Sequence, residues 1–83
     1  MSANPSRFHV SAVWDAEAEV WTATSENIPG LVTEADTLDA LTAKLQVVVP
    51  DLLVLNDVLD EHSARAIELD ILSQRRERVQ VTA

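Results

Sequence analysis

Histidine, carboxylate and arginine side chains are the groups of this chain that have the chemistry for catalysis, metal binding or phosphate contacts. The two histidines, His9 and His62, lie far apart in the sequence. Neither belongs to an HxH or HExxH pattern, and neither has a carboxylate three or four residues away. The 14 acidic residues fall in predicted turns and on polar faces, away from the inward stripe of the predicted helix. We therefore predict no metal ion, no cofactor and no catalytic residue.

Nucleophilic catalysis has little support either. The chain has no cysteine, which excludes thiolate nucleophiles, thiolate metal sites and disulfides together. It has serines but no GxSxG motif, and its single glycine, Gly30, cannot form a phosphate-binding loop. A small hydrolase would need carboxylates or histidines that the fold gathers around a pocket. It is therefore the weakest of the functions that we consider.

The basic residues cluster in the run RRER at 75–78, which contains Arg75, Arg76 and Arg78. One interpretation is a contact with phosphate groups or an acidic partner, so that nucleic-acid binding or another regulatory role is the alternative function of this chain. The other is a solvated strand edge that discourages aggregation between sheets. We favour the second, because the run is short, includes Glu77 and has no aromatic residue within it.

Length and charge indicate one acidic domain over residues 1–83, with 1–6 as a disordered or extended N-terminus and 73–83 as a strand extension or tail. The net charge is −8, and up to Ser63 eleven acidic residues stand against two basic ones. This balance disfavours direct nucleic-acid binding and favours a basic partner. The polar start MSANPSRF is unlike a signal peptide, and no apolar run is long enough to span a membrane. We expect a cytoplasmic protein without membrane contact.

Alternating apolar and polar residues predict three short strands in the first half of the chain. RFHVSAVWD at 7–15 and VWTATS at 20–25 form a hairpin with a loop of about four residues, and LVTEA at 31–35 is the third strand. Between the last two, Pro29 and Gly30 suit the centre of a type II turn. We place Trp14 in the core, whereas Trp21 is a candidate contact on an open sheet face, because Val20 competes for the inward direction.

A helix follows, with Asp36 or Thr37 as its cap. Pro50 lies within it and is expected to kink the helix or divide it near Val49, because proline removes one backbone donor. Apolar residues recur at helical spacing along an inward stripe, which comprises Leu38, Leu41, Leu45, Val48, Val49, Leu52, Leu55 and Leu59.

Val47, Val54 and Val58 lie nearly opposite this stripe. A domain with one sheet and one helix has nothing of its own to cover that side. The pattern therefore predicts a homo-oligomer, either a dimer or a tetramer, or a heterologous partner along the helix. The competing interpretation is that the kink at Pro50 turns both apolar sets toward one sheet.

The segment ARAIELDIL at 64–72 alternates again and predicts a fourth strand. Residues 73–83 extend this strand, form a fifth strand through Val79 and Val81, or fray. The order β-β-β-α-β predicts an α+β two-layer sandwich, in which one long Pro-kinked helix covers one face of a meander sheet. The passage into the last strand is a right-handed crossover if the third and fourth strands lie parallel.

Residues 8–53 resemble the HicB family, above all its short uncharacterised members. The resemblance rests on Trp14-Asp15 at the end of the first strand, Val20-Trp21 at the start of the second, Ile28-Pro29-Gly30-Leu31 at the corner and Glu34-Ala35-Asp36-Thr37-Leu38 before the helix. It implies a degenerate ribonuclease H-like fold without a working nuclease centre. It also implies an antitoxin that binds a small basic HicA-type mRNA interferase and blocks its catalytic histidine or RNA surface. An acidic body suits that role, since opposite charge speeds encounter.

Full-length HicB antitoxins carry a C-terminal helix-turn-helix or ribbon-helix-helix segment. Residues 73–83 are too few for either, so operator binding is not expected. The sequence thus predicts a non-catalytic, antitoxin-like protein-binding module. Its candidate contacts with a partner or a second copy are Trp21, Val47, Val54, Val58, Arg75, Arg76 and Arg78.

Overall fold

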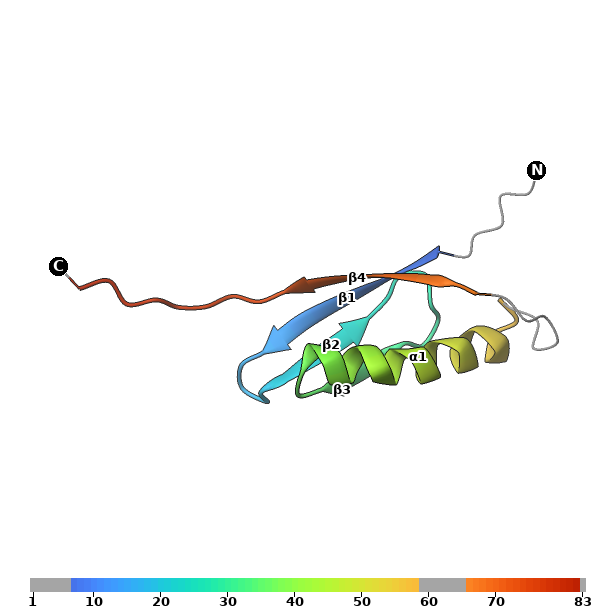
Figure 1. Ribbon diagram of the computed structural model, residues 1–83, viewed down its shortest axis with the longest axis horizontal. Helices are drawn as coiled ribbons and strands as arrows, with labels where there is room; N and C mark the ends of the chain where they lie inside the picture. The colour runs from blue at the N-terminus through green and yellow to red at the C-terminus, as the bar shows by residue number, and fades with distance from the viewer. Residues whose placement is uncertain (1–6, 59–65, 83) are drawn as a thin grey trace.

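A computed structural model describes residues 7–58 and 66–82. Its elements are β1 (Arg7–Asp15), β2 (Val20–Thr24), β3 (Val32–Ala35), α1 (Leu38–Leu55) and β4 (Glu68–Gln74). The predicted order β-β-β-α-β is confirmed. The architecture is α+β, with a four-stranded sheet and one helix packed across one of its faces (Figure 1).

The sheet is mixed and not a pure meander. β1, β2 and β3 pair antiparallel in sequence order, whereas β4 pairs in parallel with β1, which gives the order β3-β2-β1-β4. The chain therefore leaves one edge of the sheet at β3 and returns to the opposite edge as β4 after passing through α1 (Figure 1). β3 and β4 run in the same direction but are not neighbours.

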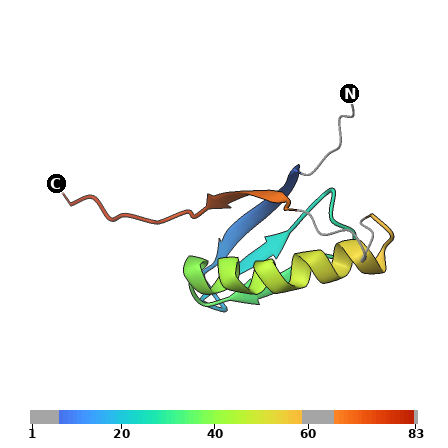
Figure 2. The ribbon, with the colours of Figure 1, turned by 45° about the vertical axis from the view of Figure 1, so that its right-hand side comes forward.

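The core lies between α1 and the inner face of the sheet. α1 lies over β2 and β3, so that β4 is left near the margin of the core (Figure 2). Accordingly, Ile67, Leu69 and Ile71 in and next to β4 are half-buried. The fully enclosed apolar residues are Phe8, Val10, Ala12, Trp21, Ala23, Ile28, Leu31, Leu41, Leu45, Val49 and Leu53.

The two predicted turns in the first half are confirmed. Asp15 pairs with Val20, which leaves a loop of four residues, and the carboxylate of Asp15 accepts bonds from the N–H groups of Glu17 and Ala18 at 3.0 and 3.2 Å. At the Pro-Gly corner, Leu31 N–H bonds to the Ile28 carbonyl at 3.2 Å. Gly30 has a φ of 80°, the value that a type II turn requires and that glycine adopts without strain.

Local hydrogen bonds define both ends of α1. Thr37 is the cap, and its Oγ1 accepts a bond from Ala40 N–H at 3.0 Å. At the other end, Val58 N–H bonds to Leu53 O at 2.8 Å and Asp57 N–H to Val54 O at 3.1 Å. Asp57 is left-handed, with a φ of 61°. This is a Schellman motif, and it ends the helix at Leu55.

Two details predicted for α1 are wrong. Of the two alternatives given for Pro50, a kink or a division, the division is wrong, because the helix is one element through residue 55. Pro50 and Gln46 are exposed, so water can satisfy the carbonyl that loses its donor. Leu55, predicted to face inward, is 76% exposed. The buried row advances around the helix in steps of four residues to Leu53, which turns Leu55 away from the sheet. Leu59, the last residue of the predicted stripe, lies outside the described residues.

The fourth strand starts later than predicted. Its pairing with β1 runs from Arg7 opposite Glu68 to Val13 opposite Gln74, so β4 starts level with the start of β1 and ends two residues before β1 does. Positions 64 and 65 lie outside the described residues. Residues 75–82 form no fifth strand, and they leave the sheet as an extended, exposed segment (Figure 1).

Candidate functional site

The side of α1 that faces away from the sheet is the first candidate surface. We call Val47, Asp51 and Val54, together with Val58 three residues after the helix ends, the outer α1 face. Val47 is 65% exposed and Val58 44%, while Val54 is half-buried. The interpretation that a kink turns both apolar sets inward is therefore wrong. α1 continues through Pro50 as one helix, so its opposite sides remain opposite.

The outer α1 face also contains a charged residue, and a hydrogen bond ties its helix to the sheet. Asp51 is exposed between the valines, and Leu55 adds an exposed apolar side chain beside Val58. Lys44 lies toward β3, where its Nζ donates to the Glu34 carbonyl at 2.6 Å. The face is thus an apolar strip with a carboxylate within it, on a helix tied to the sheet.

Trp21 does not lie on an open sheet face, and that prediction is wrong. The hairpin register places Trp21 directly opposite Trp14 on the inner face, with ring centroids 5.4 Å apart and planes tilted by 60°. Trp21 is 8% exposed and belongs to the core, while Val20 is half-buried. α1 contacts β2, and the strand alternation that turns Ala23 into the core turns Trp21 inward as well.

The three predicted arginines lie where segment 75–82 leaves the sheet. The guanidinium of Arg75 stacks over Trp14, 4.4 Å from the ring centroid, and Arg75 also pairs with Glu77. Arg76 and Arg78 line a hollow of about 940 Å³ beside it. The hollow also contains Glu19 and Asp36, so carboxylates balance its arginines.

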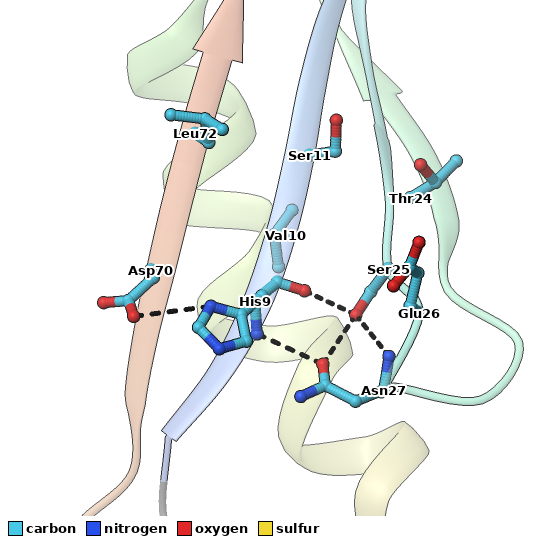
Figure 3. A pocket seen from close by; sticks show the side chains of 9 residues that line it. All are labelled: His9, Val10, Ser11, Thr24, Ser25, Glu26, Asn27, Asp70 and Leu72. Carbon is cyan, nitrogen blue, oxygen red and sulfur yellow. Dashed lines mark hydrogen bonds and ion pairs between the residues drawn. The ribbon is translucent and has the colours of Figure 1, made fainter.

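A pocket of about 690 Å³ lies on the opposite, exposed face of the sheet (Figure 3). His9 Nδ1 lies 3.4 Å from Asp70 Oδ2, and the same oxygen lies 3.6 Å from Arg7 Nε. Both His9 and Asp70 are more than half exposed, so water screens these charges. The lining residues are His9, Val10, Ser11, Thr24, Ser25, Glu26, Asn27, Asp70 and Leu72.

Ser25, His9 and Asp70 share this pocket but do not form a catalytic triad. The Ser25 hydroxyl accepts bonds from the backbone N–H groups of Asn27 and Ile28 at 3.2 and 3.1 Å. Its proton points to the His9 carbonyl or to Asn27 Oδ1, and the His9 ring faces Asp70 instead (Figure 3). In a triad the imidazole must contact the nucleophile. Here the hydroxyl is engaged with the backbone and holds the segment before the Pro-Gly corner against β1.

Comparison with known proteins shows the family. Residues 7–83 match the model of a domain of unknown function, DUF1902. The chain belongs to this family. A solved structure, that of the hypothetical protein TTHA1013 from the extremely thermophilic bacterium Thermus thermophilus, has 40% sequence identity and a TM-score of 0.65. The similarity covers 90% of this chain and 99% of that one. No curated protein matches the chain.

The DUF1902 match leaves the resemblance to HicB as a prediction. Within residues 7–58 and 66–82, no three His, Asp or Glu side chains lie close enough together to hold a metal ion. His62 falls outside those ranges. No helix in the described part of this DUF1902 domain is long and apolar enough to cross a membrane.

Sequence reasoning missed three features of this DUF1902 domain. These are the exposure of Leu55, the Arg75–Trp14 stack and the Ser25 network. The four-residue row that ends at Leu53 could have revealed the first. A serine three residues before Ile28 is typical of a turn stabilised by a side chain and could have revealed the third. The stack has no local signal, because it joins two segments distant in sequence.

Proposed function

We propose that this DUF1902 chain is a non-catalytic, HicB-like binding module whose outer α1 face docks onto a small basic protein, such as a HicA-type mRNA interferase. The observation that carries the proposal is the exposure of Val47 on a helix whose other side is buried in the core, continued by the exposed Val58 just after the helix ends. Apolar side chains held on a rigid helix lose little conformational freedom when a partner covers them.

The charge of the chain favours a basic partner. The net charge is −8, and Asp51 lies within the apolar strip itself. A carboxylate there would be costly against an acidic or wholly apolar partner, but it pairs with an arginine or lysine on a basic one. Long-range attraction to an acidic body also raises the association rate.

The antitoxin role rests on the resemblance within residues 8–53, which fold as β1, β2, β3 and most of α1. The Ile28–Leu31 corner and the Thr37 cap, both quoted for the resemblance, are formed as a turn and a helix start. In this proposal the module acts by covering the catalytic or RNA-binding surface of the toxin. It supplies no reacting group, in keeping with the engagement of Ser25 by the backbone.

The experiment is a binding and rescue assay with a HicA-type toxin encoded beside this chain in its genome. The wild-type chain should bind the purified toxin and restore growth to cells that express it. Val47→Lys should weaken binding by tenfold or more, because it places a like charge against a basic partner. Val32→Lys is the matched control, since Val32 is 75% exposed on β3, away from α1. The same loss in both variants would show a general charge effect and reject the docking face. An absence of toxin binding and of rescue would reject the antitoxin role.

A further inference from the structure

The C-terminal arm, residues 75–82, continues the direction of β4 and extends away from the rest of the molecule (Figures 1 and 2). Its apolar residues have no cover, since Val79 is 76% and Val81 89% exposed. The two valines alternate with polar residues, as in a strand with one buried face. The arm thus has the alternation of a strand but no partner strand within the described part of the chain.

A turn of the arm back onto its own strand is disfavoured. Residues 74–82 contain no glycine, proline, asparagine, aspartate or serine, the residues that dominate tight turns. β4 is an edge strand, so its outer backbone groups have no partner strand in the described sheet. The open edge and the unpaired strand do not meet within one molecule in this structure, but they can meet between two copies.

We propose that β4 and the C-terminal arm of one copy pair antiparallel with the same segment of a second copy, about a two-fold axis next to Gln74. β4 has seven residues and the described arm has eight. Each arm therefore spans the β4 of the other copy, and the two sheets join into one. The contact is self-complementary, which is the usual form of a two-fold interface.

This register places the two valines of the arm opposite apolar residues of β4 and its neighbour. Odd-numbered residues of β4 face the core, and the arm continues that alternation. With Gln74 on the axis, Val79 lies opposite Leu69 and Val81 opposite Ile67. Leu69 and Ile67 are half-buried because α1 does not reach over β4. The valines of the second copy thus extend the apolar inner face over the margin where it is incomplete.

Charge supports the same pairing. On the outer face Arg78 lies opposite Asp70, and cross-strand pairs of opposite charge stabilise antiparallel sheets. The arm from Arg75 to Thr82 carries three arginines and one glutamate, whereas the described residues before Val58 are strongly acidic. Glu77 lies opposite Ile71 in this register and keeps its ion pair with Arg75. The basic arm therefore fits a second copy of this acidic chain.

The stack of Arg75 on Trp14 directs the arm before pairing. It holds the first residue of the arm 4.4 Å from a ring that is itself packed on Trp21. An arm fixed at its base loses less conformational entropy when it pairs. This dimer does not depend on the proposed toxin partner, because the arm and the outer α1 face are separate surfaces.

Sedimentation equilibrium of the full chain tests the pairing. The wild-type chain should dimerise, and Val79→Lys and Val81→Lys should each raise the dissociation constant on the order of tenfold or more, because each places a charge at the apolar contact. Gln80→Lys is the matched control. It adds the same charge on the outer face, opposite Glu68, and should leave the constant equal or lower, because a cross-strand pair of opposite charge favours the pairing. A monomer at all concentrations, or a dimer that tolerates lysine at both valines, would overturn the proposal.

A cysteine introduced at the axis tests the register. The chain has no cysteine of its own, so each variant carries one thiol. Facing residues of antiparallel strands have Cα atoms about 4.5–5.5 Å apart, within the range of a disulfide. Gln74→Cys should form a covalent dimer under mild oxidation, and Val32→Cys, exposed on the far edge, should not. Cross-linking through Val32 alone, or through neither residue in a protein that sediments as a dimer, would show that the copies meet elsewhere.

Discussion

The strands of the folded body and the C-terminal arm both alternate apolar and polar residues. Valines on the inner face of the sheet are nevertheless buried in the body, whereas those of the arm are exposed. Val10 in β1 is 2% exposed, with β2 and β4 on either side, whereas Val81 in the arm is 89% exposed. The sequence pattern of the two segments is nearly the same. The difference shows that alternation specifies a strand, while burial depends on which neighbours the chain provides.

The comparison also separates two kinds of exposed apolar surface. The outer α1 face lies mainly on a helix whose other side is buried in the core, so the backbone that carries it is already held in place for a partner. The arm contacts the body through the stack of Arg75 on Trp14, and in our proposal a second copy covers its valines. In our proposals these two surfaces serve different partners, a basic protein and a second copy.

The largest effect on stability is expected from replacing a valine of the body with alanine, and the same replacement in the arm is its comparison. Val10→Ala should lower the free energy of unfolding by about 2–3 kcal/mol, because it removes buried methyl groups and leaves a cavity. Val81→Ala should change it by less than about 0.5 kcal/mol when the protein is too dilute to associate. Urea unfolding monitored by tryptophan fluorescence measures both. Similar losses in the two variants would mean that the arm is part of the core.

Ser25→Ala should lower the free energy of unfolding by about 1–3 kcal/mol. It removes the acceptor of two backbone N–H groups and the link between the Pro-Gly corner and β1. Ser11→Ala, on the same exposed sheet face, should change it by less than about 0.5 kcal/mol. Thermal unfolding compares the two variants. If Ser25→Ala proved as stable as the control, the hydroxyl would not hold the corner, and its role in the pocket would need another explanation.

Thr37→Ala should cost about 1 kcal/mol, because the first turn of α1 loses its side-chain acceptor. Asp36→Ala is the control next to it and should cost less than about 0.5 kcal/mol. Urea titrations followed by circular dichroism at helical wavelengths report the difference. A larger loss at Asp36 would place the cap one residue earlier and contradict the observed helix start.

Arg75→Ala should have the smallest effect on the body, about 0.5–1 kcal/mol, because a partly exposed cation–π contact is lost. The substitution should also make the backbone of the arm more mobile, because the arm loses its contact with Trp14. Backbone amides of residues 76–82 should show smaller ¹H–¹⁵N NOE values in the variant than in the wild-type protein at equal low concentration. Arg76→Ala should leave these values unchanged. Equal loosening in both would mean that the stack does not direct the arm.

Local features of the fold could be predicted because short-range physics sets them. β1 has its predicted bounds, and β2 and β3 lie within one residue of theirs. Pro29 and Gly30 form the expected turn because their φ preferences are intrinsic to these residues. The helix start needed only a choice between two adjacent caps.

The candidate site could be predicted less well, because its residues depend on contacts across the fold. The outward direction of Val47 was predictable from helical spacing alone. That of Trp21 was not, since it depends on which face of β2 packs against α1. The meeting of Ser25 with β1 and of Arg75 with Trp14 joins segments that no local pattern links.

By itself, the sequence determined the strand alternation, the Pro-Gly corner, the capped helix with two apolar sides and the acidic charge, since each follows from residue type and spacing. The tertiary structure decided where β4 pairs and which leucines α1 buries. It also decided that the arm has no partner strand within the described residues. The reason is that a side chain is buried only when another segment packs against it. The alternation of one strand does not specify which segment, in this copy or in another, will do so.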